Sequence, residues 1–106
     1  MLFRSGDYAL QLNSSGYYNS AFGTGALQQN TSGSSNAAFG MYSLNLNTTG
    51  SNNVGIGPWT GGTPGALASN TTGSANITVG SGALGSNTTA SNNTAVGYQE
   101  IGRAHV

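Results

Sequence analysis

The chain lacks cysteine and lysine and carries almost no charge: its 106 residues include two arginines, two acidic residues and one histidine. Without cysteine there is no disulfide, no thiolate metal site and no cysteine nucleophile. Two basic side chains give no electrostatic footprint for nucleic acid. No apolar run approaches the ~20 residues that a membrane-spanning helix needs. These absences predict no nucleic-acid partner and no membrane contact from this segment.

Catalytic groups are equally scarce. General acid–base catalysis needs titratable side chains within reach of one another, and between residues 6 and 99 the only charged residue is Asp7. Serine and threonine are abundant, but no base is present to activate them. The sequence therefore predicts a protein that is not an enzyme and holds no cofactor and no metal. The one metal alternative is a weak site for a hard cation, built from asparagine amides and carbonyl oxygens.

What the sequence has in abundance is glycine, 18 residues in all, and glycine recurs with a fixed period of seventeen. The repeats begin at Gly6, Gly23, Gly40, Gly57, Gly80 and Gly97. The fourth repeat is longer because residues 60–65 are inserted in it. A period of this length indicates a stack of equivalent structural units.

Four further positions of the repeat keep their residue type. The fifth position is always leucine: Leu10, Leu27, Leu44, Leu67 and Leu84. The eighth position is always asparagine: Asn13, Asn30, Asn47, Asn70 and Asn87. The fourteenth position is also asparagine: Asn19, Asn36, Asn53, Asn76 and Asn93. The last position is large and apolar: Phe22, Phe39, Ile56, Val79 and Val96.

Each conserved position has a local interpretation. The segment from the fourteenth position to the next glycine, such as NAAFG at 36–40, is short, apolar and ended by a breaker, which predicts a strand. Its last side chain and the small residue before it point to opposite sides. The block N-[ST]-[ST]-G predicts a turn in which asparagine bonds its own backbone and glycine supplies a positive φ. Ala90 replaces that glycine once, so positive φ there is either unnecessary or strained. The leucine segment is too short to decide between a second strand and one helical turn.

One repeat cannot fold alone. Burying its two large apolar side chains gives roughly 4–6 kcal/mol, whereas ordering the backbone of the whole repeat costs on the order of 20 kcal/mol. Stacking of neighbours with backbone ladders between them closes the gap. The predicted fold is all-β: a parallel β-solenoid or left-handed β-roll over residues 6–99, with one short helical turn per coil as an option. The thin core favours three chains whose small-residue faces turn toward a common axis.

The element NxxA[VIF]G, as in NNTAVG at 92–97, resembles the head repeats of trimeric autotransporter adhesins. The phrase NTAVGYQ at 93–99, with GALxxNTTGxxN before it, is similar to the repeat arrays of phage tail-fibre proteins. The resemblance covers residues 6–99, although the repeat is longer than the usual adhesin-head coil and the insertion after Trp59 is a further departure. It implies an extracellular homotrimeric fibre on a virion or a bacterial surface, which provides spacing and attachment to a host receptor or glycan.

Both ends of the chain break the repeat. Residues 100–106, EIGRAHV, stand where the repeat predicts Ala-Leu, and one reverse translation of them is the start of a widely used sequencing adapter. The reverse complement of that adapter, read from a GTG start codon, encodes MLFRS, which is residues 1–5. We therefore expect both ends to derive from adapter sequence and the repeats to be a piece of a longer reading frame. The alternative is a genuine basic tail.

Aromatic side chains are the candidates for contact with a partner. Tyr8, Tyr42 and Trp59 share the third position of the repeat, and exposed aromatics often mark binding surfaces. The alternative is that they pack between coils or chains. Trp59 is the first candidate because insertions on solenoids often lie on the binding face. The second function to weigh is an ice-binding or carbohydrate-binding solenoid: Thr48 and Thr71 belong to hydroxyl columns, although these columns fall in the predicted turn.

Overall fold

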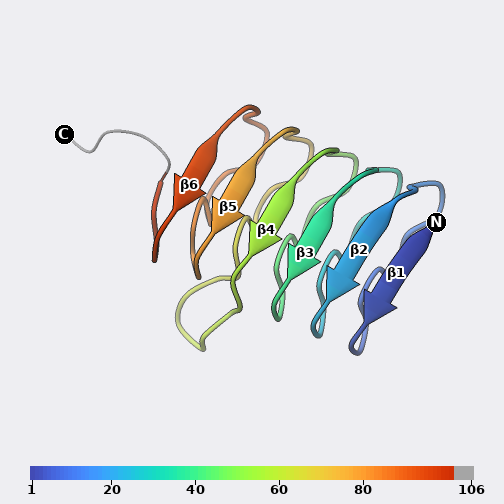
Figure 1. Ribbon diagram of the computed structural model, residues 1–106, viewed down its shortest axis with the longest axis horizontal. Coiled ribbons are helices and arrows are strands. Elements are labelled where there is room, and N and C mark those ends of the chain that lie inside the picture. Colours follow the sequence, from blue (N-terminus) through green and yellow to red (C-terminus); the bar gives the residue numbers. More distant parts are fainter. Residues whose placement is uncertain (102–106) are drawn as a thin grey trace.

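A computed structural model describes residues 1–101, in which six short strands form one parallel sheet and no helix is present. The strands are β1 (Leu2–Ser5), β2 (Asn19–Phe22), β3 (Ala37–Phe39), β4 (Val54–Ile56), β5 (Ile77–Val79) and β6 (Thr94–Val96). They lie side by side in chain order, and each connection runs behind the sheet to the start of the next strand (Figure 1). The predicted parallel β-solenoid is confirmed.

The strand register repeats from coil to coil. Coils 1 to 5 begin at Gly6, Gly23, Gly40, Gly57 and Gly80 and end in β2 to β6. Strand residues pair with their equivalents in the next coil, so that Ala21 lies beside Ala38 and Phe22 beside Phe39. The inserted residues do not disturb this register, because Ile56 still pairs with Val79. The insertion is therefore accommodated wholly outside the sheet.

The interior of the stack is built from leucines and small residues. The leucine column packs against the residues one before the strand ends, which are Ala21, Ala38, Gly55, Thr78 and Ala95, all of them buried. The large residues at the strand ends lie on the outer face. The prediction that the small residues face a trimer axis is thus wrong, since they point into their own coil. The reason is the thinness of the coil: a Cβ on Gly55 would already lie 2.8 Å from Oγ of Ser43 and 3.3 Å from Cγ of Leu44.

The leucine segment is neither a strand nor a helical turn. It is a run of overlapping tight turns, in which Ala26 N–H donates to Gly23 O, Gln28 N–H to Gly25 O and Asn30 N–H to Leu27 O. The leucine of every coil adopts a left-handed conformation, with φ between 48° at Leu84 and 55° at Leu67. That conformation costs a leucine about 1–2 kcal/mol. It also directs the Leu27 N–H to Ser43 O in the next coil, at 3.1 Å, while the side chain is buried.

The turn after the eighth position forms, but its glycine has a different role from the predicted one. Gly16, Gly33, Gly50 and Gly73 do not adopt positive φ. They are needed because the next coil lies directly on them: a Cβ on Gly33 would collide with the carbonyl oxygen of Gly50 and lie 2.6 Å from Oδ1 of Asn30. Positive φ occurs instead at the thirteenth position, for example 58° at Ser35.

The two ends join the stack to different extents. Leu2–Ser5, which the sequence places outside the repeats, forms β1 and pairs with β2, with all four side chains exposed. At the other end Leu84 N–H donates to Glu100 O at 2.8 Å, the bond that Leu67 N–H makes to Ala83 O one coil earlier. The adapter origin of the ends stays a prediction, and residues 102–106 of the expected tail lie outside the described residues.

Candidate functional site

The eighth-position asparagines form a continuous ladder of amides through the stack. Asn47 Nδ2 donates to Oδ1 of Asn30 in the preceding coil at 2.8 Å, and to the carbonyl of Gly50 in its own coil at 2.9 Å. The same pair of bonds recurs in the coils on either side. The structure thus joins in one column Asn13, Asn30, Asn47, Asn70 and Asn87.

The fourteenth-position asparagines form a second ladder of a different kind. The backbone N–H of Asn36 donates to Oδ1 of Asn19 at 2.9 Å, and its Nδ2 donates to Gly50 O in the next coil at 2.8 Å. The column continues through Asn53, Asn76 and Asn93. Within residues 1–101, no buried side-chain nitrogen or oxygen lacks a hydrogen-bond partner. A fully satisfied buried network of this kind fixes one register between coils.

The threonine hydroxyls of the ninth position are engaged within the stack. Thr31 Oγ1 donates to Thr48 O, and Thr48 Oγ1 donates to Thr71 O, each at 3.1 Å. In each of the first three turns, three backbone N–H groups converge on the same carbonyl; Thr31, Ser32 and Gly33 all donate to Thr48 O. The ninth-position column therefore offers no free row of hydroxyls to ice. The exposed tenth-position hydroxyls of Thr49 and Thr72 leave the ice-binding alternative a prediction.

Of the three candidate aromatic residues, the structure brings two together. The rings of Tyr42 and Trp59 meet edge to face, with centroids 6.1 Å apart and an interplanar angle of 74°. The Tyr42 ring occupies the space over Gly25, where a Cβ would collide with it. Tyr8 is exposed and has no ring contact in the described part of the chain. The aromatic corner, by which we mean Tyr42 and Trp59, is thus a pair in coils 3 and 4.

The inserted residues 60–65 are packed against coil 5 and against coil 6, the partial coil that begins at Gly97. Thr63 is 4% exposed, and its hydroxyl is hydrogen-bonded to that of Tyr98 at 2.7 Å. Pro64 O accepts the N–H of Gly82 at 2.8 Å, as the second residue of an ordinary coil does. Gly82 leaves room for this, because a Cβ there would lie 2.6 Å from Cγ2 of Thr63. The loop, drawn in yellow in Figure 1, is thus attached to the stack through its last residues, Thr63 and Pro64.

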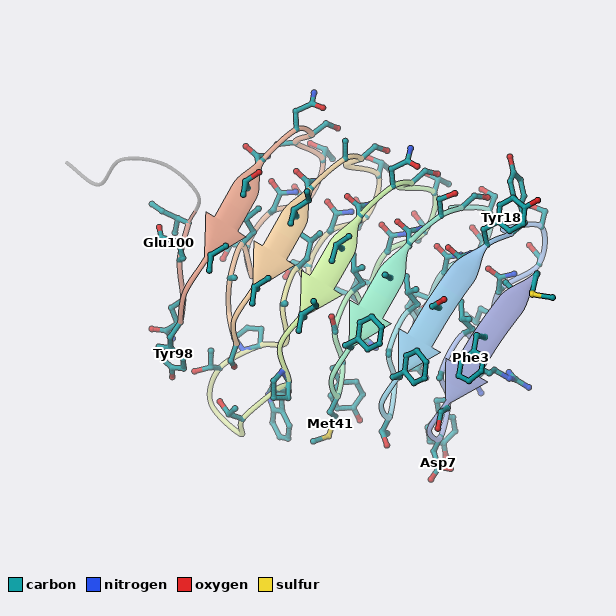
Figure 2. The ribbon with its side chains drawn as sticks, in the orientation of Figure 1. Phe3, Asp7, Tyr18, Met41, Tyr98 and Glu100 are labelled. Atoms are coloured by element: carbon teal, nitrogen blue, oxygen red, sulfur yellow. The ribbon has the colours of Figure 1, made fainter. Side chains whose placement is uncertain are left out.

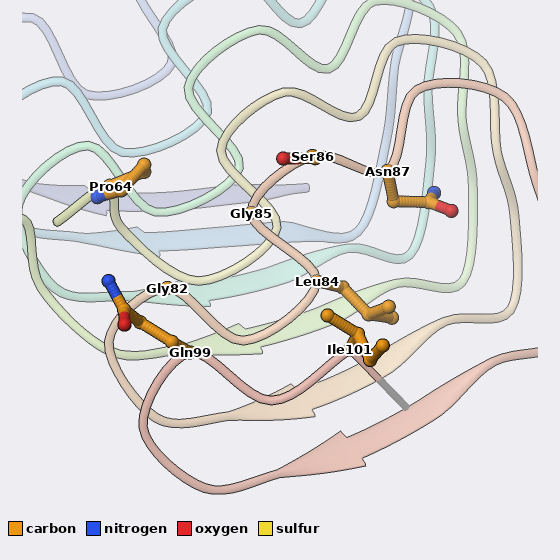
Figure 3. Close-up of a pocket in the computed structure, with 8 residues that line it drawn as sticks. All are labelled: Pro64, Gly82, Leu84, Gly85, Ser86, Asn87, Gln99 and Ile101. Carbon is orange, nitrogen blue, oxygen red and sulfur yellow. The ribbon is translucent and has the colours of Figure 1, made fainter. Parts of the chain in front are cut away.

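A cavity of about 380 Å³ lies where the described leucine column ends (Figure 3). Leu84 and Ile101 form its apolar wall and Asn87 its polar edge. Among the described residues that line it there is neither an acid nor a base. Within residues 1–101 no three His, Cys, Asp or Glu side chains gather as metal ligands would. The same residues contain no helix able to cross a membrane.

Sequence reasoning missed two groups of aromatic rings. Tyr17 and Tyr18 are exposed and meet edge to face at 5.1 Å, in positions where the next repeat has Ser34 and Ser35. Phe22 stacks on Phe39 at 4.8 Å with the rings 7° from parallel. The sequence could have predicted the phenylalanine stack. Phe22 and Phe39 both occupy the last position of the repeat, and a parallel sheet places equivalent residues one strand spacing apart.

Comparison with known proteins gives no functional assignment for the chain. No family model matches the chain, and no curated protein and no solved structure shows significant similarity to it.

Proposed function

We propose that this chain is a structural repeat segment of a homotrimeric extracellular fibre, on a virion tail or a bacterial surface, that provides spacing and attachment to a host. The observation that carries the proposal is the equivalence of the coils: hydrogen bonds recur between residues seventeen apart, as from Asn30 to Asn13 and from Thr31 to Thr48. The resemblance of the repeats to adhesin heads and tail fibres supports the same function.

A stack of equivalent coils is suited to building length. Each coil contacts its neighbours through the same bonds, so coils add without new interactions, at a rise of about 4.8 Å each. Between residues 6 and 99 Asp7 is the only charged residue, so such rods repel one another little when they lie side by side. Much of the solvent-exposed surface outside the sheet is asparagine, serine and threonine. These properties fit a spacer better than a catalyst.

The location of the protein tests the proposal directly. Antibodies raised against the folded repeats, detected by immunogold electron microscopy, should label thin fibres that project from virions or from cells. The matched control is an antibody depleted on the folded chain, which should leave the fibres unlabelled. Label confined to the interior of cells would contradict the proposal.

Attachment is assigned to the aromatic corner. We expect Trp59→Ala to weaken adhesion of the fibre to host cells while the circular dichroism spectrum and the melting temperature stay unchanged. Tyr8→Ala is the matched control, since Tyr8 occupies the same repeat position but does not contact Trp59. Equal adhesion of the two variants would remove the corner from the binding surface. Carbohydrate binding is the second candidate function, because exposed aromatic rings often mark binding surfaces and Trp59 is 41% exposed; a glycan array probed with both variants tests it.

A further inference from the structure

The inserted loop leaves the stack and returns to it at one point. Ala66 N–H donates to Gly57 O at 2.9 Å, the bond that Ala26 N–H makes to Gly23 O in coil 2. Residues 58–65 therefore stand where coil 2 has only two residues between the same bonded groups. The coil beneath the loop is continuous, and the loop is an addition to its edge.

A single hydroxyl of coil 5 joins the two legs of this loop, by which we mean Pro58 and Pro64. Ser81 Oγ donates to Pro58 O at 2.7 Å, and Pro64 O lies 3.4 Å from the same hydroxyl. A serine hydroxyl has one proton to donate, so the short bond to Pro58 is the main one. The far side of the loop is held where the Thr63 hydroxyl bonds Tyr98. Figure 2 shows the loop on the lower edge of the stack, beside the labelled Tyr98.

Trp59 directly follows the first leg, and its backbone is bonded on both sides. Its N–H donates to Met41 O in coil 3 at 2.9 Å. The carbonyl before it, that of Pro58, accepts the bond from Ser81 in coil 5, and the proline ring fixes its own φ. The Trp59 side chain is nevertheless 41% exposed. Trp59 therefore combines an exposed ring with a backbone that is tied to the coils before and after it.

A rigid exposed ring is suited to binding. A partner orders the side chains that it touches, and each mobile side chain lowers the affinity by the freedom that it loses. Rings that are held before binding lose little, and rigid aromatic residues are frequent anchors of binding surfaces for this reason. Charge offers no substitute here, because between residues 6 and 99 only Asp7 is charged. The orientation of the ring is therefore a main determinant of affinity at the aromatic corner.

We propose that Ser81 is a positioning residue, whose hydroxyl holds Trp59 in the orientation in which the aromatic corner binds its partner. The inference rests on the proposed attachment through that corner. Ser81 acts through the carbonyl of Pro58, one residue before the ring, and needs no contact with the partner itself. Among the second positions of the repeats only this one is a serine, and it is the one that meets the legs of the loop.

Time-resolved fluorescence of the full chain tests the positioning, since Trp59 is its only tryptophan. In Ser81→Ala we expect the share of the anisotropy that decays by fast local motion to rise roughly twofold, while the circular dichroism spectrum and the melting temperature stay unchanged. Ser81→Thr keeps the hydroxyl and should match the unaltered chain. The control Ser86→Ala removes an exposed hydroxyl of the same coil and should change nothing. An unchanged decay in Ser81→Ala, or an equal change in the control, would overturn the proposal.

Adhesion of the full chain to host cells gives the second readout. Ser81→Ala should weaken it roughly threefold to tenfold, as expected for one side chain that must be ordered on binding. In a Trp59→Ala background the same change should have no further effect, because it acts through that ring. Unaltered adhesion of Ser81→Ala, in an assay that Trp59→Ala weakens, would refute the positioning role. If Trp59→Ala adheres normally while Ser81→Ala changes the decay, the attachment function is wrong and the positioning of the ring by Ser81 stands.

Discussion

At the scale of single residues, the eleventh-position glycines are required by close contact between coils. A Cβ on Gly50 would collide with the carbonyl oxygen of Gly73 and lie 2.5 Å from Oδ1 of Asn47. Ala90 occupies the same position in coil 5, where no described residue lies on it as Gly73 lies on Gly50. The sequence showed that this position holds either glycine or alanine, but not which of these residues is covered by the next coil. The role of the glycine follows from the stack and not from its own φ.

Gly50→Ala should therefore destabilise the protein strongly. Overpacking against rigid backbone lowers the free energy of unfolding by about 2–3 kcal/mol, measured by urea denaturation. The matched control is Ala90→Gly, which creates no collision and should change that free energy by less than about 1 kcal/mol. Comparable losses in both variants would show that the corner is held by something other than this contact.

The asparagine ladders predict a second effect at the residue scale. In Asn47→Asp a carboxylate oxygen replaces a donor, and it then faces two acceptors, Oδ1 of Asn30 and the carbonyl of Gly50. We expect a loss of roughly 3 kcal/mol of unfolding free energy at neutral pH, because the carboxylate oxygen that replaces Nδ2 is buried without a donor, while the other oxygen keeps only the bond from Asn70 Nδ2.

The pH dependence of that variant has a definite sign. Burial against acceptors raises the carboxyl pKa in the folded state above the unfolded value of about 3.9. The destabilisation is therefore relieved below pH ~4, where the protonated acid can donate one bond, and it grows as the pH rises. Asn52→Asp, an exposed position, should show no such dependence in its melting temperature. A pH-independent loss in Asn47→Asp would argue against the ladder.

At the scale of elements, the strands were predictable and the leucine segment was not. The apolar segment that ends at a glycine breaker marks β3 and β6 in the sequence. The conformation at Leu44, with φ of 51°, contradicts local preference, because leucine rarely adopts left-handed angles. The bonds to the next coil impose it, as from Leu44 N–H to Ala66 O at 3.0 Å. The sequence of a single repeat does not show its bonds to the next coil. Neither of the two predicted alternatives, a second strand or one helical turn, was therefore right.

The inserted loop is the other element whose role depends on distant residues. Thr63→Val keeps the methyl group over Gly82 but removes the hydroxyl that bonds Tyr98. We expect faster hydrogen exchange at the amides of Gly82 and Gln99, with a loss of about 1 kcal/mol of unfolding free energy. Thr60→Val, an exposed change in the same loop, should leave exchange at these amides unchanged. Equal protection in both variants would mean that the loop does not hold coil 6.

At the scale of the whole molecule, the period alone was enough to predict the solenoid, because seventeen-residue units cannot bury a core singly. The orientation of the coil was not predictable from the same pattern. Alternation in the strand assigns large and small residues to opposite sides but does not say which side is inside. The thickness of the coil decides this, since Leu44 and Ser43 leave space opposite them only for Gly55. The pairing of Tyr42 with Trp59, and not with Tyr8, likewise required the three-dimensional arrangement.

From the shortage of charge we predict how the melting temperature of the whole molecule responds to salt. Arg4, Asp7 and Glu100 are the only charged side chains of the described residues, so almost no Coulomb term holds the stack together. The melting temperature should change by less than about 2 °C between ~10 mM and ~300 mM sodium chloride, a range over which the screening length falls several-fold. A marked fall with salt would show that an ion pair contributes to the stack.

The equivalence of the coils also bears on how such a gene changes. Unequal recombination between two repeats deletes or duplicates one whole coil, and the coils on either side then meet through the same ladders as before. A frame-preserving gain or loss of seventeen codons is therefore nearly neutral for the fold, whereas a change of one or two codons inside a coil shifts every column. Rod length is expected to vary among related genes in whole steps of about 4.8 Å.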